Sequence, residues 1–263
     1  MTERTYKGYL LDLDGTIYRG GEVIPEAVSF VEALKKKGIP YQYVTNNSSL
    51  TPEQLAEKLQ KMGLNAVPED FFTSSMAVAE TIEEIERKEK TMDKVKVLAI
   101  GEKGLKMALS EAGYELVEKA PASYVVVGID RQFTYEKMKQ ATLAIYGGAR
   151  FLSTNCDRAI PTEEGLVPGN GSLTASIAYA TRTEPLYVGK PEQAIIILAL
   201  EKLGLRTDEV LLIGDNLETD IAAGGRSGVD TLLVYSGFSR EADLEGAEVQ
   251  PTYTVSSLAD WSI

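Results

Sequence analysis

The 263-residue sequence contains no histidine and a single cysteine, Cys156. Without histidine, the Ser-His-Asp and Cys-His mechanisms, phosphohistidine chemistry and histidine-based zinc sites are excluded. One cysteine cannot form an internal disulfide and leaves no structural zinc set. The residue six positions after Cys156 is Thr162 rather than an arginine, so a cysteine-phosphatase loop is excluded as well. The chemistry that remains uses carboxylates, lysine, hydroxyl groups and metal ions.

Positive charge is also scarce, since 27 Lys+Arg against 39 Asp+Glu give a formal net charge of −12. This balance argues against binding to nucleic acid or to anionic membranes, because both need basic surfaces. A phosphorylated substrate would then need a local cation, which a divalent metal can supply. No apolar run approaches the roughly 18–20 residues of a membrane span, and residues 1–7 show no secretory pattern. Together with the lone thiol, this predicts a cytoplasmic protein.

Short apolar runs that end abruptly in polar residues recur along the chain, a pattern typical of buried parallel strands. Between them lie segments with helix signals, such as a starting proline and a terminal glycine. This alternation predicts an α/β fold with a doubly wound, Rossmann-like parallel sheet. The predicted strands are 8–11, 41–44, 186–188, 210–213 and 231–234, and the predicted helices are 25–37, 51–63, 191–203 and 218–227. Ligands bind at the carboxyl ends of such strands, so the polar residues there are expected to converge.

The middle of the chain, residues 81–184, is predicted to form a second α/β unit inserted into the first. Its predicted strands lie near 95–100, 124–127 and 150–153, and its predicted helices near 102–112, 134–146 and 172–181. The core would then consist of residues 1–80 and 185–263.

Two carboxylates, Asp12 and Asp14, follow the first predicted strand and precede Gly15 and Thr16. Asp12 can attack phosphorus as a nucleophile, and one of its oxygens can hold a hard cation. Asp14 can protonate the leaving alkoxide and then deprotonate the attacking water. An ordinary strand-to-turn Asp pair would have the same local sequence.

Two further strand ends carry groups that suit phosphate. Thr45, with the amides of Asn46 and Asn47, can bind phosphate oxygens, although the same residues suit a plain loop. Lys190 precedes a proline-initiated helix, where it can neutralise the nucleophile and hold a transferring phosphoryl group. A solvated surface lysine is the alternative.

An acidic loop follows the strand predicted at 210–213. Asp215 suits a magnesium ligand, because Mg²⁺ prefers a few carboxylates together with waters and substrate oxygens. Asp220 can accept a hydrogen bond from Lys190 or from a metal-bound water, or it can simply complement a helix N-terminus. The order of a nucleophile pair, a threonine, a lysine and an acidic loop makes the whole set more specific than any member.

In this order of motifs the sequence resembles the haloacid dehalogenase-like phosphatase superfamily. It resembles most closely the NagD-type, p-nitrophenylphosphatase-like branch, which has a large α/β cap. The resemblance covers nearly the whole chain, including 154–157, 165–169 and 171–173 in the predicted insertion. Residues 16–25 are too few for a cap after the nucleophile loop, so the insertion between Thr45 and Lys190 would be the cap, in the position called C2.

The resemblance also implies roles for individual residues. Asp12 would be the nucleophile and Asp14 the acid/base, with Thr45 and Lys190 completing the catalytic set. Magnesium would be held by Asp12, the backbone carbonyl of Asp14 and Asp215, with Asp220 behind it. The implied phosphate-binding residues are Thr45, Asn46, Asn47, Lys190 and Asn216.

The implied activity is Mg²⁺-dependent hydrolysis of small phosphomonoesters through a phosphoaspartate on Asp12. Sugar phosphates, nucleoside monophosphates and p-nitrophenyl phosphate are the implied substrates. Analogy with relatives that form cap-mediated dimers allows a homodimer, but the sequence itself leaves the oligomeric state open. Asp14 favours a phosphatase over a dehalogenase or an ATPase. A phosphomutase of the same superfamily and a catalytically silent phosphometabolite-binding protein are the alternatives.

Overall fold

The computed structural model describes residues 5–90 and 94–263. Contacts between residues divide the chain into two compact units. Unit 1 comprises the chain up to Thr45 together with Pro52–Phe72 and Lys190–Ile263, and unit 2 comprises Asn46–Thr51 and Thr73–Gly189. The predicted insertion, 81–184, lies within unit 2, and residues 46–51, 73–80 and 185–189 go with it. That unit 1 is a catalytic core and unit 2 its cap stays a prediction.

Unit 1 is built on a six-stranded sheet with the strand order β15-β14-β13-β1-β4-β5. The central strand β1 pairs in parallel with β13 and with β4, and β14 pairs in parallel with β13 and β15. The strands are β1 (Gly8–Leu11), β4 (Tyr41–Thr45), β5 (Phe71–Thr73), β13 (Val210–Gly214), β14 (Asp230–Val234) and β15 (Tyr253–Val255). Every residue of β1 and β13 is buried, as expected for strands that are covered on both faces.

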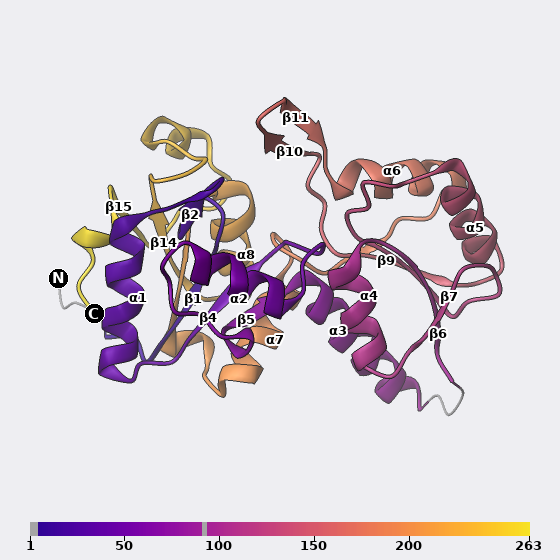
Figure 1. Cartoon of the computed structure of the whole chain (residues 1–263), viewed down its shortest axis with the longest axis horizontal. Helices are drawn as coiled ribbons and strands as arrows, with labels where there is room; N and C mark the ends of the chain where they lie inside the picture. Colours follow the sequence, from indigo (N-terminus) through magenta and orange to yellow (C-terminus); the bar gives the residue numbers. More distant parts are fainter. Residues whose placement is uncertain (1–4, 91–93) are drawn as a thin grey trace. The chain divides into compact units, whose positions relative to one another are not determined.

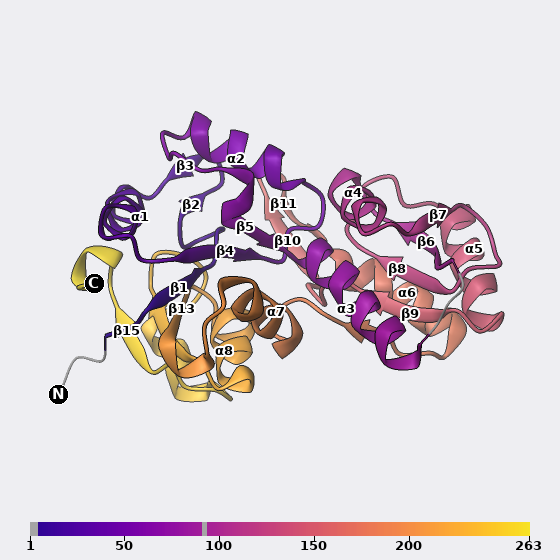
Figure 2. The same cartoon turned by 90° about the horizontal axis from the view of Figure 1, so that it is seen from below.

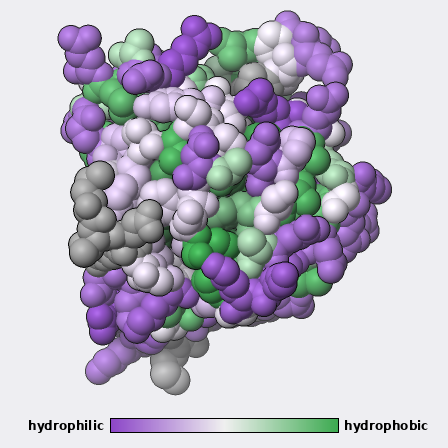
Figure 3. All heavy atoms as spheres, turned by 90° about the vertical axis from the view of Figure 1, so that its left-hand side faces the viewer, coloured by the Kyte–Doolittle hydropathy of each residue, from purple (hydrophilic) through white to green (hydrophobic). Residues whose placement is uncertain are grey.

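Helices cover both faces of this sheet, with α1 and α2 on one side and α7 and α8 on the other (Figure 2). They are α1 (Pro25–Lys37), α2 (Pro52–Lys61), α7 (Gln193–Leu203) and α8 (Ala222–Ser227). A π-helical turn, η3 (Leu217–Ile221), leads into α8, and a short hairpin, β2 (Tyr18–Arg19) and β3 (Glu22–Val23), follows β1. On the side of unit 1 that Figure 3 shows, hydrophobic residues lie in separate patches among hydrophilic ones.

Short 3-10 turns complete unit 1. They are η1 (Pro68–Asp70), η2 (Thr207–Glu209), η4 (Glu241–Gly246) and η5 (Leu258–Asp260).

Unit 2 has its own five-stranded sheet, with the order β12-β9-β8-β6-β7 and parallel pairing throughout. The strands are β6 (Lys96–Ile100), β7 (Glu115–Val117), β8 (Tyr124–Val127), β9 (Arg150–Ser153) and β12 (Leu186–Tyr187). A separate hairpin joins β10 (Ala159–Thr162) to β11 (Gly165–Pro168).

Four helices pack on this second sheet. They are α3 (Ser74–Glu89), α4 (Lys103–Glu111), α5 (Tyr135–Tyr146) and α6 (Asn170–Thr181). Helices α5 and α6 pack on one face of the sheet, and α3 and α4 lie together on the other (Figure 1). Side chains alternate between the two faces: Val125 and Val127 face α5 and α6, and the buried Val126 points the opposite way.

The predicted α/β fold with parallel sheets flanked by helices is confirmed. One strand assignment is wrong: the run at 186–188 forms β12, which pairs with β9 in unit 2 and not with the sheet of unit 1. Strands pair in parallel in both sheets, so a two-residue strand carries no sequence signal for one over the other. The helix predicted at 218–227 begins as the π turn η3, and α3 and β7 were not predicted. Among the described residues, no helix combines the length and apolar character that crossing a membrane would require.

Candidate active site

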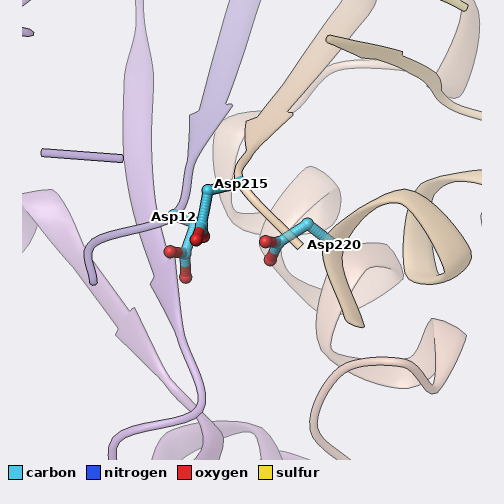
Figure 4. Close-up of side chains that lie close together, drawn as sticks. All are labelled: Asp12, Asp215 and Asp220. Atoms are coloured by element: carbon cyan, nitrogen blue, oxygen red, sulfur yellow. The ribbon is translucent and has the colours of Figure 1, made fainter. Parts of the chain in front are cut away.

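Three buried carboxylates meet at the carboxyl ends of β1 and β13. The register of these parallel strands sets Leu11 opposite Ile213, and the Asp12 amide donates to the Ile213 carbonyl at 2.9 Å. Asp12 and Asp215 therefore follow neighbouring strand ends, and Asp220 comes from the turn η3. One carboxylate oxygen from each of the three aspartates lies within 4.8 Å of the others. Figure 4 shows Asp12 and Asp215 side by side, with Asp220 turned toward them.

Lys190 supplies the cation of this cluster and is only 2% exposed. Its Nζ donates to Asp12 Oδ1 at 2.5 Å and to Asp220 Oδ1 at 2.7 Å. Its third contact is the carbonyl of Val44 in β4, at 2.9 Å. An ammonium group has three donors, so this geometry holds Lys190 between the nucleophile candidate and β4, and it is not a solvated surface lysine.

The cluster carries more negative than positive charge. Burial raises the pKa of Asp12 well above its ordinary value, with the charges of Asp220 and Asp215 adding and Lys190 opposing. Burial also raises the pKa of Asp215, to about 7, and Asp220 adds to that shift. Burial alone would lower the pKa of Lys190, but Asp12 and Asp220 outweigh it and raise that pKa. Three carboxylates around one ammonium leave a buried site that a further cation would stabilise.

Asp220 is already committed to protein contacts. Its Oδ1 accepts from Lys190 and its Oδ2 accepts from the Asn216 amide at 3.1 Å. Asp12 and Asp215 are therefore the better candidates for direct metal ligands, while Asp220 orients Lys190. This contact between Lys190 and Asp220 is one of the two that the sequence analysis allowed.

The loop after β14 encloses the Asp215 carboxylate. The Phe238 amide donates to Asp215 Oδ2 at 2.6 Å. A Cβ at Gly237 would lie 1.9 Å from that oxygen and one at Gly15 would lie 2.2 Å away, so a side chain at either position would displace the carboxylate or the backbone. Sequence analysis did not identify this loop, although its place directly after a predicted strand, 231–234, was an available signal.

Asp14 stands apart from the carboxylate cluster. Its side chain is exposed, and its Oδ2 accepts from the Tyr18 hydroxyl at 2.9 Å. An exposed carboxylate beside the candidate nucleophile suits a group that exchanges protons with substrate and water.

The predicted phosphate-binding residues lie in different parts of the chain. Thr45 is buried and ends β4, directly after Val44. Asn216 uses its side chain to accept from the Glu218 amide at 2.8 Å and so caps η3.

Asn46 and Asn47 belong to unit 2. The Asn46 carbonyl accepts from Ser74 Oγ and from Asn155 Nδ2, both at 2.9 Å. Asn47 Oδ1 accepts from the amides of Ser49 and Leu50, both at 3.0 Å. The side chain of Asn47 thus closes a turn.

Comparisons with known proteins identify the family of this chain. The family described as haloacid dehalogenase-like hydrolase matches residues 9–115, and a related HAD-like hydrolase family matches residues 187–261. A relative from Bacillus subtilis named 5'-nucleotidase YutF is 48% identical over 258 residues, 98% of each chain. An acid sugar phosphatase from Staphylococcus aureus is 45% identical, covering 97% of this chain and 96% of its own.

Solved structures extend the likeness to the fold. A thermostable NPPase mutant from Geobacillus stearothermophilus superimposes with a TM-score of 0.90 at 45% identity, covering 98% of this chain and 99% of its own. NagD from Escherichia coli K-12 gives a TM-score of 0.89 at 32% identity, with the same coverage. The chain therefore belongs to the haloacid dehalogenase-like hydrolase family and is an enzyme of its NagD-type phosphatase branch, as the order of its motifs predicted.

Proposed function

We propose that this chain is a Mg²⁺-dependent phosphatase that hydrolyses small phosphomonoesters through a phosphoaspartate on Asp12. The observation that carries the proposal is the contact of Asp12 with Lys190 at 2.5 Å, beside the carboxylate of Asp215. A buried lysine at this position contacts the proposed nucleophile. Its ammonium group can also stabilise the negative charge on the phosphoryl group as it is transferred.

The donor set fits a hard dication. The carboxylates of Asp12 and Asp215 are buried, negatively charged in excess of Lys190, and of the type that Mg²⁺ prefers. The backbone carbonyl of Asp14 is the third proposed ligand. A bound Mg²⁺ would supply positive charge that reduces the repulsion between the nucleophile and the phosphate oxygens.

The proposed reaction has two steps. The Asp12 carboxylate attacks phosphorus, the bond from phosphorus to the ester oxygen breaks, and Asp14 gives its proton to the leaving oxygen. Asp14 then takes a proton from water, whose oxygen attacks phosphorus. The bond to Asp12 breaks, inorganic phosphate leaves and both carboxylates return to their starting state.

The remaining polar groups would hold the phosphate. In unit 1 we assign this role to Lys190 and to the hydroxyl of Thr45, with Asn216 in the acidic loop as a further candidate. Lys190 contacts Asp12, and Thr45 ends β4. The amides of Asn46 and Asn47 are proposed to add two donors.

We infer the substrate class from the names of the relatives. Their names, 5'-nucleotidase and acid sugar phosphatase, support nucleoside monophosphates and sugar phosphates as substrates of this chain. We assign unit 2 as the cap that limits access by water and sets specificity. The net charge of −12 also favours small substrates over nucleic acid. A cytoplasmic location remains the expectation.

The test is Asp12→Asn, assayed for phosphate release from p-nitrophenyl phosphate with Mg²⁺. We expect kcat to fall at least ~10³-fold, because the amide is not a nucleophile. The matched control is Asp130→Asn, which alters another Asp–Lys pair that has a buried aspartate, Asp130 Oδ2 with Lys137 Nζ at 2.7 Å. Undiminished turnover by Asp12→Asn would exclude the phosphoaspartate. With a sugar phosphate as the substrate, isomerised phosphate ester in place of free phosphate would favour the phosphomutase.

A further inference from the structure

A buried tyrosine contacts the proposed proton carrier. Tyr18 begins β2, is 0% exposed, and donates from its hydroxyl to Asp14 Oδ2 at 2.9 Å. The backbone between the two residues is tied as well: the Gly15 amide donates to the Tyr18 carbonyl at 2.7 Å. Tyr18 and Asp14 also form an isolated bridge between their backbones. The hydroxyl and the carboxylate are therefore held in register by a tight turn.

The Tyr18 hydroxyl acts as a donor only. Burial raises the pKa of Tyr18, and the charge and hydrogen bond of Asp14 raise it further. A tyrosine hydroxyl, with an ordinary pKa of about 10, is protonated near neutral pH and donates a hydrogen bond to one carboxylate oxygen, so the other oxygen can face the substrate.

A lysine from a separate helix caps the Tyr18 ring. Lys58, in α2, places its Nζ 3.7 Å from the centroid of the Tyr18 ring. The side chain is half-buried, and burial lowers the pKa of Lys58 while the charge of Asp14 opposes that shift. A cation over an aromatic face at this distance is attractive, and more so when it is partly desolvated. Lys58 thus fixes the ring by a contact that the turn does not supply.

We propose that Tyr18 is a positioning residue for Asp14: it holds Oδ2 so that Oδ1 exchanges the proton with the leaving group, and Lys58 fixes the Tyr18 ring. The inference rests on the proposed function, since it assigns Asp14 to leaving-group protonation. In that step the bond from phosphorus to the ester oxygen breaks while the Asp14 proton moves to that oxygen.

This role predicts a dependence on the leaving group. p-Nitrophenolate leaves readily without a proton, whereas phenolate is more basic and gains more from protonation. The two aryl phosphates have nearly the same shape, so a defect in binding would affect them equally. A defect in proton transfer would affect phenyl phosphate more.

The experiment compares kcat/KM for p-nitrophenyl phosphate and phenyl phosphate in the wild type and in Tyr18→Phe, which keeps the ring. We expect a loss of about threefold or less for p-nitrophenyl phosphate and of about tenfold or more for phenyl phosphate. Lys58→Met should also reduce kcat/KM more for phenyl phosphate than for p-nitrophenyl phosphate, but by a smaller factor than Tyr18→Phe. Lys58→Arg should return this ratio toward the wild-type value, because Arg keeps the cation over the ring.

Matched controls separate a structural effect from a positioning effect. Tyr6→Phe removes another buried hydroxyl that donates to an aspartate, Asp230 Oδ2, at 2.8 Å. Lys202→Met removes another lysine that lies over an aromatic ring, that of Phe72, at 5.5 Å. Neither control should change the ratio between the two substrates, and thermal melts would verify that each variant is folded.

The outcomes are distinct for the two proposals. Equal losses for both substrates in folded Tyr18→Phe would overturn the positioning role while the Asp12 mechanism stands. If Asp12→Asn turns over substrate at the wild-type rate, the proposed function itself is overturned.

Discussion

At the scale of single residues, the buried carboxylates of the site outnumber the one ammonium group, Lys190, that opposes them. Asp215 is 5% exposed, and burial together with Asp220 raises its pKa to about 7. A carboxyl group with a raised pKa binds its proton more tightly in the folded than in the unfolded protein. The metal-free protein therefore loses stability as the pH rises from near the ordinary Asp pKa of about 4 toward 7.

This shift predicts a pH-dependent response to Mg²⁺. Metal binding needs ionised Asp215, so the gain in Tm from excess MgCl₂ should be small near pH 5.5 and should grow as the pH rises through about 7. Thermal melts with and without MgCl₂ across this range would measure it, and Asp215→Asn should abolish the gain. A gain that is the same at every pH, or largest at low pH, would contradict the role of Asp215.

At the scale of elements, one loop organises the metal side of the site. Residues 236–239 follow β14 and reach two other segments: Ser236 Oγ donates to the Gly15 carbonyl at 2.7 Å, and Ser239 Oγ accepts from the Leu217 amide at 3.0 Å. The Ser239 amide donates to the Asp215 carbonyl at 3.0 Å. The position of Asp215 thus depends on the turn after β1, on η3 and on this loop together.

Gly237→Ala tests the loop. A Cβ 1.9 Å from Asp215 Oδ2 must displace the carboxylate or the backbone, so we expect Mg²⁺ affinity to fall by about tenfold or more. Titration calorimetry with Mg²⁺ alone would measure the affinity. Gly246→Ala is the control, because a Cβ there meets no heavy atom within 4 Å. Equal affinities of Gly237→Ala and the wild type would show that the loop yields without moving Asp215.

At the scale of the whole molecule, the chain divides into two compact units, and the carboxylate cluster with its lysine lies entirely in unit 1. Binding free energy stabilises the cooperative unit that contains the ligands. Mg²⁺ should therefore slow hydrogen exchange in unit 1, most strongly at residues 12–16, 213–221 and 236–239. Peptides from β8 and α5 in unit 2 should exchange at unchanged rates. Equal protection in both units would show that they open as one cooperative unit.

The sequence by itself determined the fold class and the phosphatase family. Apolar runs that end in polar residues mark parallel strands, and the ends of neighbouring parallel strands meet at one edge, so Asp12 and Asp215 could be placed together before any coordinates. The absence of histidine left carboxylate and metal chemistry. The order of the motifs was enough to predict the family.

Only the tertiary structure decided how these groups contact one another. Lys190 reaches Asp12, Asp220 and the Val44 carbonyl although the strand before it, β12, belongs to the other sheet. Asp220 is tied to that lysine. Tyr18 and Lys58 carry no signal of their own, because their contacts depend on side-chain packing. Gly237 follows a predicted strand, but its close approach to Asp215 joins segments that are separated in the chain. Local patterns encode periodicity and strand ends, whereas the pairing of particular side chains depends on register and crossover, which only the folded chain fixes.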